Sequence, residues 1–295
     1  MYLDLFGSSD RLGGNIGDII SQILFSVKNN IYIRYNRNHL RVYNSYNQSY
    51  NNTIFLQTLF DIIDLHNSHL TSEDFTQNVD LSAPTHYTVW VKTLLDIETD
   101  FFTYFKKNLY INNFREKFMK YGKLKNYDIP FDPEKTILVH LRLEDVKGRP
   151  DYDGSVCANH FKNHIENGFI PDIDFDMSFR NTHPTYNNQA PLSPYKLKKI
   201  IEDILKYKPN HEVIIVTNPG EYIPELPYRY ISNDDPCYDL FLLCNSETLV
   251  LSRSNFGLSS LFFGIGNDVH IPLWGQMTCF GLYTKYDKTN FKYFI

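Results

Sequence analysis

Short strands rich in β-branched residues alternate with helices throughout the second half of the chain, and this alternation constrains the fold more than any other feature. Strands are predicted at residues 136–139, 212–217, 248–251 and 268–272, and helices at 194–207, near 237–245 and from Ser254 onward. Parallel strands need long crossover connections, which are usually helices. The pattern therefore predicts an α/β fold with a parallel sheet.

The first half of the chain is predicted to form a separate domain. A loop over residues 7–14 leads to Asn15, which can cap a helix whose apolar residues from 16 to 27 lie on one face. Further strands are predicted at 31–35 and 40–43, and further helices at 54–65 and 99–121. The segment 122–134 has the composition of a linker. The predicted domains are residues 1–130 and 131–295.

Composition limits the classes of function. The 295 residues carry a formal net charge of -5, and the pI is about 6.0, so no basic field favours nucleic acid. The Lys-rich group at 196–199 is interpreted as a solvated helix face. Four cysteines show no C-x-x-C pair: Cys157, Cys237, Cys244 and Cys279. No signal-peptide pattern and no apolar run near the ~20 residues of a membrane span are present, so we expect a soluble, cytoplasmic protein.

Polar residues follow the first strand of the second half at once. His140, Arg142 and Asp145 come directly after the apolar run 136–139. Ligands in open α/β sheets bind outside the carboxyl ends of the strands. The planar fork of an arginine at such an end suits a diphosphate. A solvated strand end is the alternative interpretation of this segment.

Three further segments can contribute to a ligand site. Gly13 and Gly14 precede a predicted helix, where the backbone can approach a phosphate closely, although a plain turn also explains them. Residues 252–257 place hydroxyl and N–H groups at another helix start, although a simple serine N-cap is common there. Asp239 heads a helix, where it can accept hydrogen bonds from a guanine edge or complement the helix dipole.

The order of these segments resembles the fucosyltransferase superfamily, which includes the α-1,2-, α-1,6- and protein O-fucosyltransferases. The early glycine-rich motif of that group is similar to residues 13–15, and its H-x-R-x-G-D-like strand end is matched by His140, Arg142 and Asp145. Its later motifs, a D-x-x-x-x-x-x-C-like helix and an S-S-F segment, are matched by Asp239, Cys244 and Ser254-Asn255-Phe256. The resemblance lies in short motifs between residues 12 and 259.

The chain departs from the family pattern at three positions. Leu143 and Glu144 stand where the central motif has a second Arg and a Gly, and Asn255 replaces the middle Ser of the last motif. These departures leave room for another GDP-sugar.

The resemblance implies a GT-B-like architecture of two Rossmann-like domains facing a cleft. It implies an inverting, metal-independent glycosyltransferase that moves fucose from GDP-fucose to a hydroxyl of a glycan or glycoprotein, with no cofactor. Arg142 would hold the β-phosphate and neutralise charge on the leaving GDP. The implied donor-binding residues are Gly13, Gly14, Asn15, His140, Arg142, Asp239, Ser254, Asn255 and Phe256.

The catalytic base is open between Asp18, Glu144 and Asp145, which are candidates by position. Some members of the family lack a dedicated base. For Asp145, orienting Arg142 or capping a turn is an alternative role.

Three rival functions stay open, and one of them is an unrelated doubly wound enzyme that binds a nucleotide but no sugar. A D-x-D pattern at Asp172, Asp174 and Asp176 can present carboxylates to Mg²⁺ or Mn²⁺ in a metal-dependent transferase, or be merely solvated. The protein can also be a non-catalytic GDP-sugar or glycan-binding module, which Leu143 and Glu144 favour.

Overall fold

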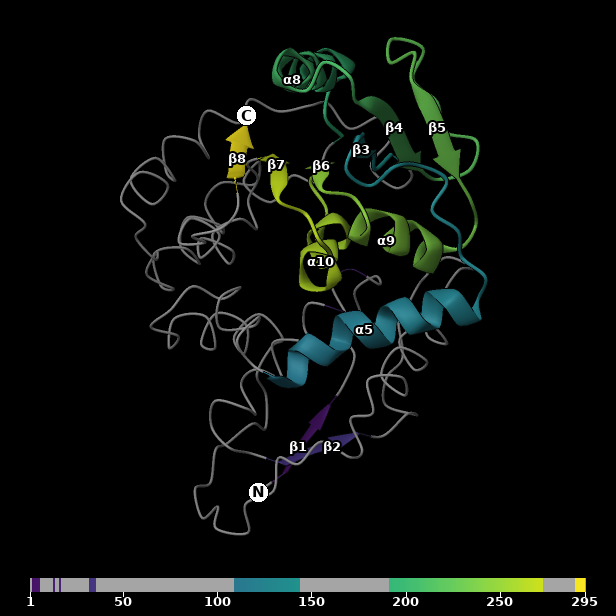
Figure 1. Cartoon of the computed structure of the whole chain (residues 1–295), viewed down its shortest axis with the longest axis vertical. Coiled ribbons are helices and arrows are strands. Elements are labelled where there is room, and N and C mark those ends of the chain that lie inside the picture. The colour runs from purple at the N-terminus through teal and green to yellow at the C-terminus, as the bar shows by residue number, and fades with distance from the viewer. Residues whose placement is uncertain are drawn as a thin grey trace, which may run out of the picture. The chain divides into compact units, whose positions relative to one another are not determined.

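The structure is a computed structural model that describes residues 2–5, 13, 16, 32–35, 109–143, 191–272 and 290–294 (Figure 1). The chain forms two compact units, Met1–Lys125 and Asn126–Ile295. The elements predicted at 40–43 and 54–65 lie outside the described residues.

In the first unit, two short strands pair in parallel. β1 (Tyr2–Leu5) lies beside β2 (Tyr32–Tyr35), with Tyr2 opposite Tyr32. The helix predicted to end at residue 121 is α5 (Leu109–Leu124), which continues through Gly122. It ends where Asn126 adopts a positive φ of 55°, a conformation that Asn tolerates better than most residues.

Gly13 and Ile16 are both helical and buried. The prediction that a loop extends to Gly14, with Asn15 as the cap, is therefore wrong at Gly13. Several earlier residues, among them Ser8 and Asp10, have equally suitable capping side chains, so the sequence does not single out Asn15. A glycine inside a helix costs only about 1 kcal/mol relative to alanine, which the burial of neighbouring apolar groups can offset.

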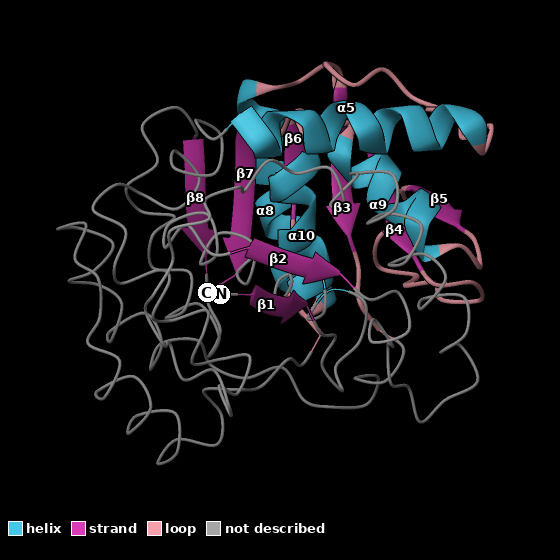
Figure 2. Cartoon of the chain, turned by 90° about the horizontal axis from the view of Figure 1, so that it is seen from below, coloured by secondary structure: helices cyan, strands magenta, loops and turns pink. Residues whose placement is uncertain are grey.

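The second unit contains a parallel sheet, which confirms the predicted α/β class. Five strands lie in the order β5-β4-β3-β6-β7, and β8 extends the edge beside β7, all pairs being parallel (Figure 2). The strands are β3 (Thr136–His140), β4 (Glu212–Thr217), β5 (Arg229–Ser232), β6 (Thr248–Val250), β7 (Asp268–Pro272) and β8 (Asn290–Phe294). The helices are α8 (Pro194–Tyr207), α9 (Pro236–Cys244) and α10 (Asn255–Phe263).

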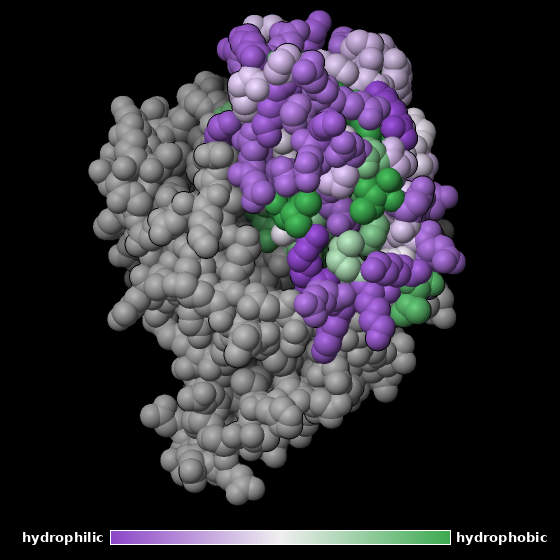
Figure 3. All heavy atoms as spheres, viewed as in Figure 1, coloured by the Kyte–Doolittle hydropathy of each residue, from purple (hydrophilic) through white to green (hydrophobic). Residues whose placement is uncertain are grey.

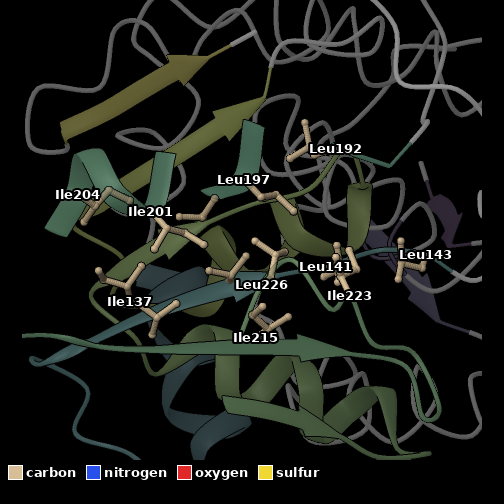
Figure 4. Packing of buried hydrophobic residues seen from close by; sticks show 13 residues of the cluster. Ile137, Leu141, Leu143, Leu192, Leu197, Ile201, Ile204, Ile215, Ile223 and Leu226 are labelled. Atoms are coloured by element: carbon tan, nitrogen blue, oxygen red, sulfur yellow. The ribbon is translucent and has the colours of Figure 1, made fainter. Parts of the chain in front are cut away.

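Both faces of the sheet are covered. On one face α8 packs its buried side chains against alternate residues of the central strands (Figure 4). This cluster includes Ile137, Val139, Leu141, Val213, Ile215, Leu197, Ile201 and Ile204. The intervening residues Leu138 and Ile214 point to the opposite face and are fully buried as well. Burial on both faces explains why these strands are continuously apolar rather than alternating.

The edge strands β5 and β8 were not predicted. β5 is only partly buried and carries Arg229 at its start, and β8 lies in a segment that the sequence presents as a Tyr- and Phe-rich tail. Edge strands need no continuous apolar run, because one side and part of each face remain open to water. The strongly apolar or well-capped elements α8, β4 and β7 have the bounds that the sequence predicts.

A charged network joins α8 to the last two strands at the amino end of the sheet. The Asp268 carboxylate lies 3.2 Å from Lys208 Nζ and 3.0 Å from Lys292 Nζ. The Tyr207 hydroxyl donates to Asp268 Oδ2 at 3.1 Å, and His270 Nε2 lies 3.3 Å from Asp268 Oδ1. Burial alone would raise the pKa of Asp268, but hydrogen bonds from His270, Lys292 and Lys208 hold it well below its usual value.

Hydrophilic residues cover most of the described surface on the face shown in Figure 3. Lys198 and Lys199 of α8 are exposed, as their interpretation as a solvated helix face predicts. Within the described ranges, no helix combines the length and apolar character that crossing a membrane requires.

Candidate functional site

The sheet has the strand order of a doubly wound fold. From β3 the chain adds β4 and then β5 toward one edge of the sheet. It then crosses back to the other side of β3, where β6, β7 and β8 follow in turn. If β3 is counted as the first strand, this is the order 3-2-1-4-5-6. Ligands of such sheets bind at the carboxyl ends of the two strands where the order reverses. Those strands are β3, which ends at His140, and β6, which is followed by residues 251–254.

A buried hydrogen bond links the ends of these two strands. His140 Nδ1 lies 2.8 Å from the Ser252 hydroxyl, although the two residues are 112 positions apart. The imidazole also faces the ring of Phe256, with centroids 5.5 Å apart. A Cβ atom added to Gly257 would lie 2.8 Å from His140 Nδ1, so only glycine lets α10 approach the ring this closely. The histidine therefore contacts three residues that follow β6.

The environment keeps His140 uncharged. Burial, and after it the positive charge of Arg142, lowers the pKa of His140 to about 3. A neutral imidazole has one N–H donor and one acceptor nitrogen, so it can exchange a hydrogen bond with a ligand without attracting it by charge.

Arg142 connects the end of β3 to the turn after β6. Its Nη1 donates to the carbonyl oxygen of Arg253 at 3.4 Å, and its side chain is half-buried. Arg253 itself is 1% exposed and is the largest fully buried side chain of the described residues. Two guanidinium groups therefore belong to the segments that meet at this edge.

The turn after β6 leads directly into the N-terminus of α10. Ser254 N–H donates to the Ser252 carbonyl oxygen at 2.7 Å, and the Ser254 hydroxyl caps the helix by accepting from Phe256 N–H at 3.1 Å. Ser254 is thus the N-cap that the sequence offered as an alternative. Because the cap uses only the oxygen, the hydroxyl hydrogen can still be donated. The first turn of α10 contains no acidic residue, and the positive end of a helix dipole favours an anion.

The N-terminus of α9 has the opposite character. Asp235 caps this helix by accepting from Cys237 N–H at 2.9 Å, and it also accepts a hydrogen bond from the Tyr127 hydroxyl. Asp239 lies in the first turn and accepts from Asn233 Nδ2 at 2.7 Å. Burial raises the pKa of Asp239 to about 7, the Asn233 hydrogen bond opposes this, and the charge of Asp235 adds to it. This helix end suits hydrogen-bond donors rather than phosphate.

The structure brings together five of the residues predicted for donor binding. His140, Arg142, Ser254 and Phe256 meet at the ends of β3 and β6, and Asn255 begins α10 beside them. Asp239 instead interacts with residues just before α9: it accepts a hydrogen bond from Asn233 and is affected by the charge of Asp235.

The other predicted residues cannot be placed in this site. Gly13 belongs to the first unit. The remaining candidates lie outside the described residues: Gly14, Asn15, Asp18, Glu144, Asp145, Asp172, Asp174 and Asp176.

The sequence singled out the segment 252–257 but gave Ser252, Arg253 and Gly257 no individual roles in the site. Their only signal was their position in the segment 252–257, between a strand and a helix. Leu143, which replaces the second Arg of the family motif, is 8% exposed and belongs to the core cluster under α8. At this position the chain uses an apolar side chain for packing, so Arg142 is the one arginine that its central motif supplies.

In the described part of the chain, no three His, Cys, Asp or Glu side chains are grouped so as to hold a metal ion. Comparison with protein-family models, curated proteins and solved structures found no match.

Proposed function

We propose that the carboxyl edge at β3 and β6 binds the diphosphate of a nucleotide-sugar, and that the protein is a glycosyltransferase. The observation that carries the proposal is the meeting of Arg142, neutral His140 and the N-terminus of α10, whose own first turn has no acidic residue, at the point where the strand order reverses. This combination offers charge, hydrogen-bond donors and a helix dipole to an anion.

The motif resemblance favours GDP-fucose as the donor and a hydroxyl of a glycan or glycoprotein as the acceptor. Arg142 would bind the β-phosphate and stabilise the charge that develops on GDP as the glycosidic bond breaks. His140 and Asp239 would meet the guanine, with Ser254, Asn255 and Phe256 around the phosphates or base. A direct displacement at the anomeric carbon would invert its configuration. The arginine and helix N-terminus would do the work of a metal ion, so the transfer would need none.

Binding and turnover test the proposal separately. We expect GDP to raise the melting temperature of the protein more than UDP, CDP or ADP, because a ligand of the folded state stabilises it by mass action. Arg142→Ala should lower the GDP affinity and reduce the transfer rate by about 100-fold or more, the scale of losing one transition-state donor. Arg142→Lys should recover only part of the lost GDP affinity and transfer rate, because lysine keeps the charge but lacks the planar fork of arginine.

Arg229→Ala is the matched control. Arg229 is an exposed arginine at the start of β5, where it pairs with Glu212 at 3.3 Å, so its loss should leave GDP binding unchanged. Equal effects of the two alanine variants would contradict the assignment of Arg142.

Leu143 supports a second candidate, a module that binds a GDP-sugar without turning it over. A family arginine is replaced there by a core residue, which removes one group that could stabilise the departing GDP. Measurable GDP binding with no transfer and no donor hydrolysis would favour this function. Transfer abolished by a chelator would instead favour the metal-dependent alternative at Asp172, Asp174 and Asp176.

A further inference from the structure

We infer that Ser252 is a positioning residue that fixes the proton of His140 on Nε2, so that His140 offers a neutral N–H donor to the ligand of the carboxyl-edge site. The part of this inference that concerns a ligand rests on the proposed function. The protonation pattern of the histidine does not depend on it.

The hydrogen bonds of the buried pair decide which nitrogen carries the proton. Ser252 is 4% exposed, and among the described residues the only recorded partner of its hydroxyl is His140 Nδ1, at 2.8 Å. If Nδ1 carried the proton, the serine hydrogen would be buried with no acceptor, which costs the desolvation of that donor. If the serine donates to Nδ1, both groups are satisfied and the proton of the imidazole is on Nε2.

Among the described residues, the polar contacts of the ring lie on its Nδ1 side. Ser252 and the backbone of Gly257 both lie on the Nδ1 side, and the Phe256 ring lies 5.5 Å away at a tilt of 46°. In the described part of the chain, no group forms a hydrogen bond with His140 Nε2. This nitrogen can therefore form a hydrogen bond with a ligand. Its partner must be a hydrogen-bond acceptor, such as a phosphate oxygen or the O6 or N7 atom of guanine.

The charges around the ring support the neutral form. Arg142 approaches from the end of β3, Arg253 lies in the turn after β6, and the first turn of α10 has no acidic residue. Burial, and after it the positive charge of Arg142, opposes a second proton on the ring and lowers the pKa of His140 to about 3. The donor at Nε2 should therefore persist across the physiological pH range.

Nitrogen NMR of the histidine side chains tests the protonation pattern without a ligand. In the full-length protein labelled with ¹⁵N-histidine, and with His140→Gln to assign the signal, we expect protonated Nε2 and unprotonated Nδ1 from pH 5.5 to 8. In Ser252→Ala, the fixed tautomer should give way to a mixture. A proton on Nδ1 in the wild type, or a titration of His140 near its ordinary value of ~6.5, would overturn the inference.

Ligand affinity tests whether this geometry matters for recognition. The probes are GDP, guanosine and inorganic pyrophosphate, measured by calorimetry. Ser252→Ala should weaken GDP binding by about 2- to 10-fold, the effect of one ordinary hydrogen bond, and Ser252→Thr, which keeps the hydroxyl, should restore it. A matching loss for guanosine would place the His140 contact on the base, and a loss for pyrophosphate would place it on the phosphates.

Ser246→Ala is the structural control. Ser246 is also fully buried, but its hydroxyl bonds backbone carbonyl oxygens at the other end of β6, so its loss should change stability without changing GDP affinity. GDP binding by Ser252→Ala as tight as by the wild type would overturn the positioning role while leaving the proposed function intact. If the wild type binds none of the three probes, the proposed function and the ligand half of the inference fail together, whatever tautomer is measured.

Discussion

Substitution of Gly257 by alanine should destabilise the protein, although helix propensity alone predicts the reverse. Gly257 lies in the first turn of α10, where replacing glycine by alanine would favour the helix by up to about 1 kcal/mol. The new Cβ would lie 2.8 Å from His140 Nδ1. Overpacking of a buried site costs about 1–3 kcal/mol, and displacing the ring from Ser252 loses a hydrogen bond of about 1 kcal/mol. The expected net loss is about 1–3 kcal/mol.

A double-mutant cycle separates the two effects. His140→Ala removes the ring that the new methyl group would strike, so in that background Gly257→Ala should be neutral or stabilising by up to about 1 kcal/mol. Urea unfolding of the four proteins, followed by circular dichroism, gives the free energies. Gly220→Ala is a useful comparison, because Gly220 has a positive φ of 78° and no atom within 4 Å of the added Cβ. Its cost should be the same with or without His140. If Gly257→Ala is equally destabilising in both backgrounds, the close contact with His140 does not exist.

Further predictions concern ionisable groups at the two ends of the sheet. Because the pKa of Asp268 is held below its unfolded value, its stabilising effect is present above about pH 4 and is lost as pH falls below it. Asp268→Asn should therefore reduce stability at pH 7 by about 1–3 kcal/mol, and the difference from the wild type should shrink in unfolding experiments below pH 4. The effect of Asp239 on stability depends on pH in the opposite direction. Its pKa is raised to about 7, so the wild type should lose stability as pH rises from about 4 to 7. The Asp239→Asn variant should lack this loss, and an unchanged pH profile would refute the burial of that carboxyl. If the ionised Asp239 accepts from guanine, calorimetry should also show GDP binding weakening between pH 8 and pH 6.

The bounds of helices and strands were predictable from the sequence where one signal, such as a continuous apolar run or a helix cap, is strong. The run of β4 is apolar because both faces of the central sheet are covered, and Ser193 followed by Pro194 marks the start of α8. The edge strands β5 and β8 were missed because they are only partly buried or follow no clear period. At Gly13, several capping residues compete, so the sequence could not fix where the helix begins.

The candidate site was predictable only in part, for a topological reason. His140, Arg142 and Ser254 were found because each follows a strand or begins a helix. Ser252 and Gly257 act through contacts with His140 that depend on β3 and β6 being neighbours. That adjacency joins residues 112 positions apart, and no local pattern encodes it.

We propose that the reversal point between β3 and β6 binds a nucleoside diphosphate. A crystal structure of the protein grown with GDP tests it most directly. We expect diphosphate oxygens within about 3.2 Å of the Arg142 guanidinium and of donors at the N-terminus of α10. GDP bound elsewhere, for instance beside the Lys208 and Lys292 network at the amino end of the sheet, would contradict it.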